Sequence, residues 1–186
     1  MILLGWVLIG AKVLLVILFF SYYNRFSVLS NRIDNSLSQI DVQLKRRSDL
    51  IPNLLESVKG YMKHEKDAIK AVTEARKALV SAKDLSSKIK ANDKLEGFLG
   101  KLFAIAENYP DLKANTNFLQ LQEELTTTED KIAYSRQFYN DSILTYNNLC
   151  TTFPGVVFAS LYGRKEKEYL KIAESERKPV KVEFDK

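Results

Sequence analysis

The chain has 186 residues, of which 46% are hydrophobic and 27% are charged, and its formal net charge is +5. Acidic and basic residues are interleaved along it, so this mild excess of cations does not indicate a nucleic-acid-binding protein. Seven glycines and four prolines are few for a domain with many β-turns, and the single cysteine, Cys150, excludes an internal disulfide. The composition favours an all-α protein in a reducing compartment.

The first twenty residues, MILLGWVLIGAKVLLVILFF, form a strongly apolar segment in which fourteen residues are Ile, Leu, Val or Phe. Its length suits a membrane-spanning helix of about 20 residues. Lys12 costs on the order of 3 kcal/mol at the centre of such a helix, and fourteen apolar residues at about 0.3 to 0.6 kcal/mol each outweigh that cost. We expect the Lys12 ammonium group to reach the nearer interface, with a contact to a partner helix as the alternative.

A cleaved signal peptide is the competing interpretation of this segment. The sequence SYYNRF that follows offers no small-residue cleavage site, and Trp6 and the pair Tyr22 and Tyr23 stand where interfacial aromatic residues belong. Cations cluster after the segment, so the positive-inside rule places the amino terminus outside and the large domain in the cytoplasm. We therefore predict an uncleaved single-pass anchor (1–22) in the inner, or cytoplasmic, membrane of the cell, in contact with lipid through residues 2–21.

An amphipathic pattern follows the anchor and continues to about Ala82. Its first apolar residues recur at steps of three or four: Phe26, Leu29, Ile33, Leu37, Ile40 and Leu44. Pro52 then interrupts the pattern, which resumes at Leu54. Either Ser48 or Asp49 caps a new helix with Pro52 in its first turn, or one helix continues and kinks at Pro52, and the pattern allows both.

Two further helical patterns lie in the second half of the chain. One helix is predicted over about 93–108 and ends at the turn sequence NYPDLKANTN. A heptad pattern comes next: Phe118, Leu125, Ile132, Tyr139 and Tyr146, with Leu121 and Leu149 at the companion position. The companion positions in between hold Thr128, Ser135 and Ser142, which are small enough for close helix packing.

A short apolar helix that ends at Gly163 and a charged tail (166–186) follow the break at Pro154 and Gly155. Short breaks between long amphipathic helices predict an antiparallel bundle of about four helices over residues 23–165.

No catalytic, cofactor or metal site is predicted. A di-metal site in a helical bundle needs Glu-x-x-His pairs, but Tyr61 stands three residues before the single histidine, His64, and Ala68 stands four residues after it. Cys150 lies beside Leu149 on the heptad helix, so we expect a buried packing residue. The usual hydrolase and nucleotide-binding motifs are absent from the sequence.

Two groups of charged residues need a separate interpretation. We expect the acidic residues Glu123, Glu124 and Glu129 to form a solvated helix face. The cations Lys45-Arg46-Arg47 allow a nucleic-acid patch, a contact with anionic lipid, or a solvated helix surface. The third is favoured, with pairing to Asp41, to Asp49 or to acids on a neighbouring helix.

Several long motifs resemble the LemA family of bacterial membrane proteins. They are RIDNSLSQIDVQLKRRSDLIPNLLESVKGYMKHE (32–65), VTEAR (72–76), LFAIAENYPDLKANTNFLQLQEEL (102–125), RQFYNDSILTYN (136–147) and FPG (153–155). The resemblance implies one amino-terminal span with its amino terminus outside, a cytoplasmic α-helical domain similar to a four-helix bundle, and helical structure over residues 41–65. It carries over no catalytic residue.

The resemblance also suggests a role. One relative takes part in building the magnetosome membrane, and membrane-bound metallopeptidases are often encoded near family members. We therefore expect a non-enzymatic, membrane-anchored scaffold whose partners are proteins, such as a membrane metallopeptidase or a second copy of the chain in a homo-oligomer, and not nucleic acid. The alternative is an accessory subunit or enzyme linked to membrane-protein quality control, with a dispersed site.

Overall fold

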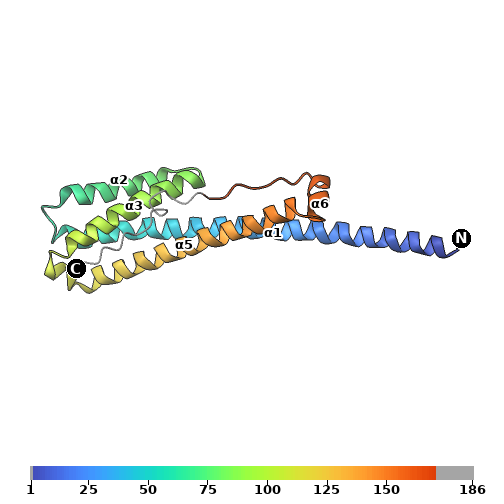
Figure 1. The fold of residues 1–186 in the computed structure, drawn as a ribbon. Coiled ribbons are helices and arrows are strands. Elements are labelled where there is room, and N and C mark those ends of the chain that lie inside the picture. The colour runs from blue at the N-terminus through green and yellow to red at the C-terminus, as the bar shows by residue number, and fades with distance from the viewer. Residues whose placement is uncertain (1, 171–186) are drawn as a thin grey trace, which may run out of the picture. The chain divides into compact units, whose positions relative to one another are not determined.

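The structure, a computed structural model, describes residues 2–170, and this part of the chain is helical without a strand. Figure 1 shows the elements in chain order: α1 (Ile2–Lys59), α2 (Lys66–Ser81), α3 (Leu85–Ala106), α4 (Pro110–Lys113), α5 (Thr116–Thr151) and α6 (Gly155–Leu161). The predicted all-α fold is confirmed. Most of the predicted charged tail (166–186) lies outside the described residues.

The described chain divides into two compact units. The first, called the anchor unit below, contains α1 up to Ser38 and the chain from Ser135 to Tyr169. The second, called the bundle unit, contains the chain from Gln39 to Tyr134. The predicted boundaries of anchor, bundle and tail (1–22, 23–165 and 166–186) remain predictions.

The amino-terminal part of α1 is apolar and exposed. By length and composition α1 is a helix that could cross a membrane, and its most apolar stretch is not buried inside the molecule. Large side chains such as Leu3, Trp6 and Ile17 are each more than half exposed. Soluble monomers rarely expose so large a continuous apolar surface, so this helix suggests membrane anchoring.

The core of the anchor unit comes from three helices. Phe26, Leu29 and Ile33 of α1 pack with Ala159 of α6 and with four residues of α5: Ile143, Tyr146, Leu149 and Cys150. Cys150 is buried, as predicted. Gly155 allows α6 to start close to α5, since a Cβ atom there would lie 2.2 Å from the Leu149 carbonyl oxygen. The predicted short helix and its end at Gly163, where φ is 65°, are confirmed.

The bundle unit contains the end of α1, then α2, α3 and the short helix α4, and the first half of α5. Helices α2 and α3 lie side by side (Figure 1). The heptad residues Phe118, Leu125 and Ile132 are buried, and the companion residue Thr128 is buried with its hydroxyl group bonded to the Leu125 carbonyl at 2.7 Å. The small polar companion residue therefore permits close packing without an unpaired hydroxyl group.

Two predicted helix limits differ from the structure. Helix α3 begins at Leu85, well before residue 93, because the Asp84 carboxylate accepts a hydrogen bond from the backbone N–H of Ser87 at 2.9 Å and caps the helix there. The helical structure implied for 41–65 stops at Lys59. The backbone N–H groups of Tyr61 and Met62 both bond to the Val58 carbonyl, which starts the turn into α2.

Pro52 lies inside the continuous helix α1, so a new helix does not begin at Ser48 or Asp49. A proline inside a helix has no N–H group for the carbonyl four residues earlier, and its ring pushes that carbonyl aside. Here that carbonyl belongs to Ser48, and the Arg76 Nε–H of α2 donates a hydrogen bond to it at 2.8 Å. Arg76 therefore replaces the hydrogen bond that Pro52 removes.

This replacement predicts a coupling between Arg76 and Pro52. Arg76→Met should lower the free energy of unfolding by about 1–3 kcal/mol, because it leaves the Ser48 carbonyl unpaired. In a Pro52→Ala background the backbone gains an N–H group at this position that can bond to the same carbonyl, so Arg76→Met should cost about 1 kcal/mol less. Thermal unfolding of the four proteins in detergent, followed by circular dichroism, measures the coupling. Equal losses in both backgrounds would show that Arg76 acts in another way.

Candidate functional site

Arg47 lies in the interior of the bundle unit, with only 1% of its surface exposed. One terminal nitrogen, Nη1, donates a hydrogen bond to the Asn92 side-chain oxygen of α3 at 3.1 Å and lies 3.9 Å from the Glu96 carboxylate. The other, Nη2, lies 3.6 Å from the Glu129 carboxylate of α5. The Nε atom is buried without a hydrogen-bond partner. Arg47 therefore links α1 to α3 and α5 inside the bundle.

The prediction that Lys45, Arg46 and Arg47 together form a solvated surface is wrong for Arg47. Successive residues of an α-helix point about 100° apart, so three adjacent side chains cannot share one face. Arg47 follows Leu44 by three residues and precedes Ile51 by four, which places it on the buried apolar stripe. That spacing was the available signal in the sequence.

The other two cations lie on the surface, as predicted. Lys45 Nζ is 2.5 Å from the Asp49 carboxylate on the same helix. Arg46 Nη2 is 3.6 Å from the Glu124 carboxylate of α5, an acid on a neighbouring helix. Asp41 pairs instead with Lys88 of α3 at 2.8 Å.

The acidic residues of α5 form a solvated face only in part. Glu123 is exposed, but Glu124 and Glu129 are half-buried and face the cations of α1. Their predicted role as a purely solvated surface is therefore corrected. The reason is that Arg47 is buried, and a buried charge needs partners of opposite charge.

Glu96 and Glu129 form a carboxyl pair beside Arg47. Burial raises the pKa of Glu96 from its ordinary value of 4.5 to about 7, helped by a hydrogen bond to Glu129 and by the charge of Glu129 and opposed by the charge of Arg47. Burial also lowers the pKa of Arg47, opposed by the charges of Glu129, Glu96 and Asp93. The cluster can hold a proton near neutral pH.

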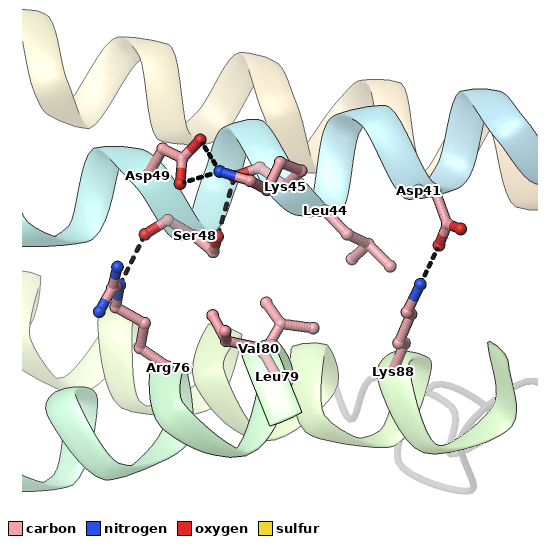
Figure 2. A pocket seen from close by; sticks show the side chains of 9 residues that line it. All are labelled: Asp41, Leu44, Lys45, Ser48, Asp49, Arg76, Leu79, Val80 and Lys88. Carbon is pink, nitrogen blue, oxygen red and sulfur yellow. Dashed lines mark hydrogen bonds and ion pairs between the residues drawn. The ribbon is translucent and has the colours of Figure 1, made fainter. Parts of the chain in front are cut away.

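A groove lies on another side of the bundle unit, between α1, α2 and the start of α3. It has a volume of about 360 Å³ and is lined by Asp41, Leu44, Lys45, Ser48, Asp49, Arg76, Leu79, Val80 and Lys88. Figure 2 shows Leu44, Leu79 and Val80 in its middle, the Lys45–Asp49 pair and Arg76 at one end, and the Asp41–Lys88 pair at the other. Val80 is 61% exposed there.

The groove combines an apolar middle with charges of both signs at its ends. Its volume falls within the range of about 300–1,000 Å³ typical of ligand sites. Such a surface suits a peptide segment that carries apolar side chains between charged ones. The sequence did not predict this groove, because its residues come from three helices whose packing the pattern of any single helix does not specify.

The remaining candidate residues do not assemble a catalytic site. His64 is exposed in the turn after α1, and Cys150 is a packing residue of the anchor unit. Within residues 2–170 there is no group of three or more His, Cys, Asp or Glu side chains that could hold a metal ion. A shallow depression of about 540 Å³ at the α1–α2 turn is lined by Met62, Ile69 and Thr73 and by four lysines: Lys59, Lys63, Lys66 and Lys70.

Comparison with known proteins identifies relatives. The family model described as LemA family matches residues 36–184. The chain is 30% identical to protein LemA of Metamycoplasma hominis, over 74% of this chain and 64% of that protein. It is 26% identical to the magnetosome protein MamQ of Magnetospirillum gryphiswaldense and 27% identical to the magnetosome protein MamQ 2 of Paramagnetospirillum magneticum, over 79% of this chain and 64% of each relative. The chain thus spans 64% of the length of these relatives.

Removal of the Arg47 side chain should strongly destabilise the bundle unit. Arg47→Ala leaves a cavity and two carboxyl groups without their cation, and breaking such a buried group costs about 3 kcal/mol or more. Lys45→Ala, which removes an exposed ion pair, should cost less than about 1 kcal/mol. The triple variant Arg47→Met, Glu96→Gln and Glu129→Gln should recover most of the loss. Thermal unfolding compares the variants, and similar losses for Arg47→Ala and Lys45→Ala would contradict the buried role.

The raised pKa of Glu96 predicts how stability depends on pH. Between pH 4.5 and about 7 the folded state holds a proton on Glu96 that the unfolded state has released, so this group's contribution to stability falls as the pH rises and levels off above about pH 7. Glu96→Gln imitates the protonated side chain. The melting temperature of Glu96→Gln, relative to that of the unchanged protein, should therefore rise from pH 5 to pH 8. A constant difference across this range would refute the assignment.

Proposed function

Because this chain belongs to the LemA family, we propose that it is a membrane-anchored, non-enzymatic helical scaffold that binds other proteins at the cytoplasmic face of the membrane. The apolar start of α1 (residues 2–21) is its contact with the bilayer. The amino terminus lies outside, because the cations follow the span. Its partners are proteins, including a membrane metallopeptidase or a second copy of the chain, and not nucleic acid.

The observation that carries this proposal is the continuity of α1. One helix runs from the exposed apolar residues near Ile2 through Pro52 to Lys59. Helix α1 therefore contributes residues to both the anchor unit and the bundle unit, so the bundle unit is tethered to the proposed anchor through it. A protein built in this way can hold a partner close to the membrane. The relatives named as magnetosome proteins support a role in organising membrane or membrane-protein assemblies.

The groove is the surface that we propose for partner binding. Its exposed Val80 and buried Leu79 offer apolar contact, and its ion pairs at both ends can bond to polar groups of a partner. Interfaces with an apolar centre and a polar rim are typical of protein–protein contacts.

The alternative is an enzyme or accessory subunit in membrane-protein quality control. The specific observation that favours it is the carboxyl pair of Glu96 and Glu129, whose proton near neutral pH suits acid–base chemistry. A hydrolase screen of the full chain would support this alternative only if an activity were found and Glu96→Gln removed it.

Site-specific photo-cross-linking in intact cells tests partner binding at the groove. A photoreactive amino acid at Val80 should yield discrete cross-linked products, identified by mass spectrometry, because Val80 lies in the groove. The same amino acid at Lys77, an exposed residue of α2 outside the groove lining, should yield several-fold less. The Val80 products should decrease when Asp41→Ala removes the exposed ion pair at the other end of the groove.

Two results would count against the scaffold. Cross-linking that is absent at both sites, in a protein that also migrates as a monomer in nanodiscs, would remove its basis. Equal cross-linking at Val80 and Lys77 would show that the groove is not the binding surface.

A further inference from the structure

Helix α6 is fixed against the carboxyl-terminal end of the apolar part of α1. The Tyr162 hydroxyl, just after α6, donates a hydrogen bond to the Phe19 carbonyl at 2.5 Å. The Phe158 ring stacks on Tyr22 with centroids 4.6 Å apart, and the Tyr162 ring meets Phe19 edge-on at 5.2 Å. These contacts hold α6 beside α1 within the anchor unit (Figure 1).

This attachment sets the depth of α6. Phe19 lies inside the proposed membrane segment 2–21, and each helical residue advances about 1.5 Å along the axis. An atom bonded to the Phe19 carbonyl therefore lies within a few ångströms of the segment's end. If the bilayer surrounds residues 2–21, it must also meet α6.

The face of α6 that points away from the core is mostly apolar, with Ser160 as its exposed polar residue. Phe158, Ala159 and Tyr162 face the core of the anchor unit, whereas four apolar side chains are exposed: Phe153 by 84%, Val156 by 41%, Val157 by 56% and Leu161 by 64%. Val157 and Leu161 are four residues apart and so share one side of the helix.

The charges that follow α6 nearly balance. Arg164, Lys165 and Lys167 alternate with Glu166 and Glu168. Asn147 fixes this segment, because its side-chain amide donates to the Lys167 carbonyl at 2.9 Å and its side-chain oxygen accepts from the Lys167 N–H at 2.8 Å. Attraction to anionic lipid is thus small here, and apolar contact must supply the affinity.

We propose that the surface formed by Phe153, just before α6, and by Val156, Val157 and Leu161 of α6 inserts into the interfacial layer of the bilayer beside α1. The protein then contacts the bilayer through two elements, the spanning helix and α6. The inference rests on the proposed membrane anchor. Lipid is the occupant favoured over a second copy of the chain, because Tyr162 attaches α6 to α1 at Phe19 and Tyr23, next to the exposed Phe20 at the end of the proposed membrane segment.

Fluorescent labels on single cysteines test the proposal in the full chain. Three variants are made in a Cys150→Ala background, each with one new cysteine: Leu161→Cys, Leu15→Cys or Lys77→Cys. Each variant is labelled with an environment-sensitive dye and reconstituted in phosphatidylcholine nanodiscs, with one chain in each nanodisc. Leu15 reports on the anchor and Lys77 on water. We expect nitroxide lipids to quench the dye at Leu161 several-fold more than at Lys77, with little change when anionic lipid is added.

A second variant checks that the apolar face causes the insertion. With the dye at Phe153→Cys, the double substitution Val157→Ser and Leu161→Ser should reduce the quenching of this dye by nitroxide lipids to the level seen at Lys77→Cys. The fold should persist, because the Val157 and Leu161 side chains are both exposed. Val28→Ser, at a similarly exposed valine of α1, should leave the quenching unchanged. Circular dichroism confirms that each variant is folded.

The possible failures are distinguishable. Quenching at Leu15 without quenching at Leu161 would overturn the insertion of α6 and leave the anchor intact. Absence of quenching at both sites would overturn the anchor and the inference with it. The dye at Leu161→Cys could instead be shielded from water only when two chains share a nanodisc, with no quenching by nitroxide lipids. That result would identify a second copy of the chain as the occupant and overturn the lipid contact.

Discussion

The hydrogen bond from Arg76 to the Ser48 carbonyl is the contact on which the continuity of α1 depends. Pro52 removes the backbone donor for that carbonyl, and an unpaired carbonyl inside a bundle is costly. Arg76 of α2 supplies the missing donor at 2.8 Å. It thereby allows one helix to hold both the apolar anchor residues and the core residues of the bundle unit. The same contact forms one end of the groove, so it stabilises the helix and shapes the surface at once.

Arg47 gives the bundle unit a second polar constraint. Its guanidinium group contacts α3 and α5 through Asn92, Glu96 and Glu129. Apolar side chains tolerate small shifts of one helix along another, whereas a buried charge with few partners does not. The cluster therefore favours one register of α1 against α3 and α5. Because Glu96 holds a proton near neutral pH, the strength of this constraint varies with pH.

The two surfaces proposed for contacts differ in their physical character. The groove of the bundle unit combines an apolar middle with ion pairs, which suits a partner protein. The outer face of α6 is apolar and adjoins the end of the proposed span, which suits lipid. The two proposals thus assign the contact with the membrane and the contact with a partner to separate residues of the chain.

The helical class, the apolar amino-terminal segment, the heptad face of α5 and the burial of Cys150 could all be predicted from the sequence. These follow from composition and from the spacing of apolar residues along single helices, which are local properties. The sequence also indicated Asp49 as one of the alternative partners of the cations at 45–47, and Lys45 forms that pair because residues four apart are neighbours on a helix.

The effect of Pro52, the partners of Arg47 and the position of the groove follow from the packing of the helices against one another. Each depends on a residue from a second helix: Arg76 for Pro52, Glu129 for Arg47, and Lys88 for the far end of the groove. The pattern of one helix states which face is apolar, but not which side chain of another helix will meet a given atom. That pairing is fixed by the packing of the helices, and so the candidate site could not be identified before the fold was known.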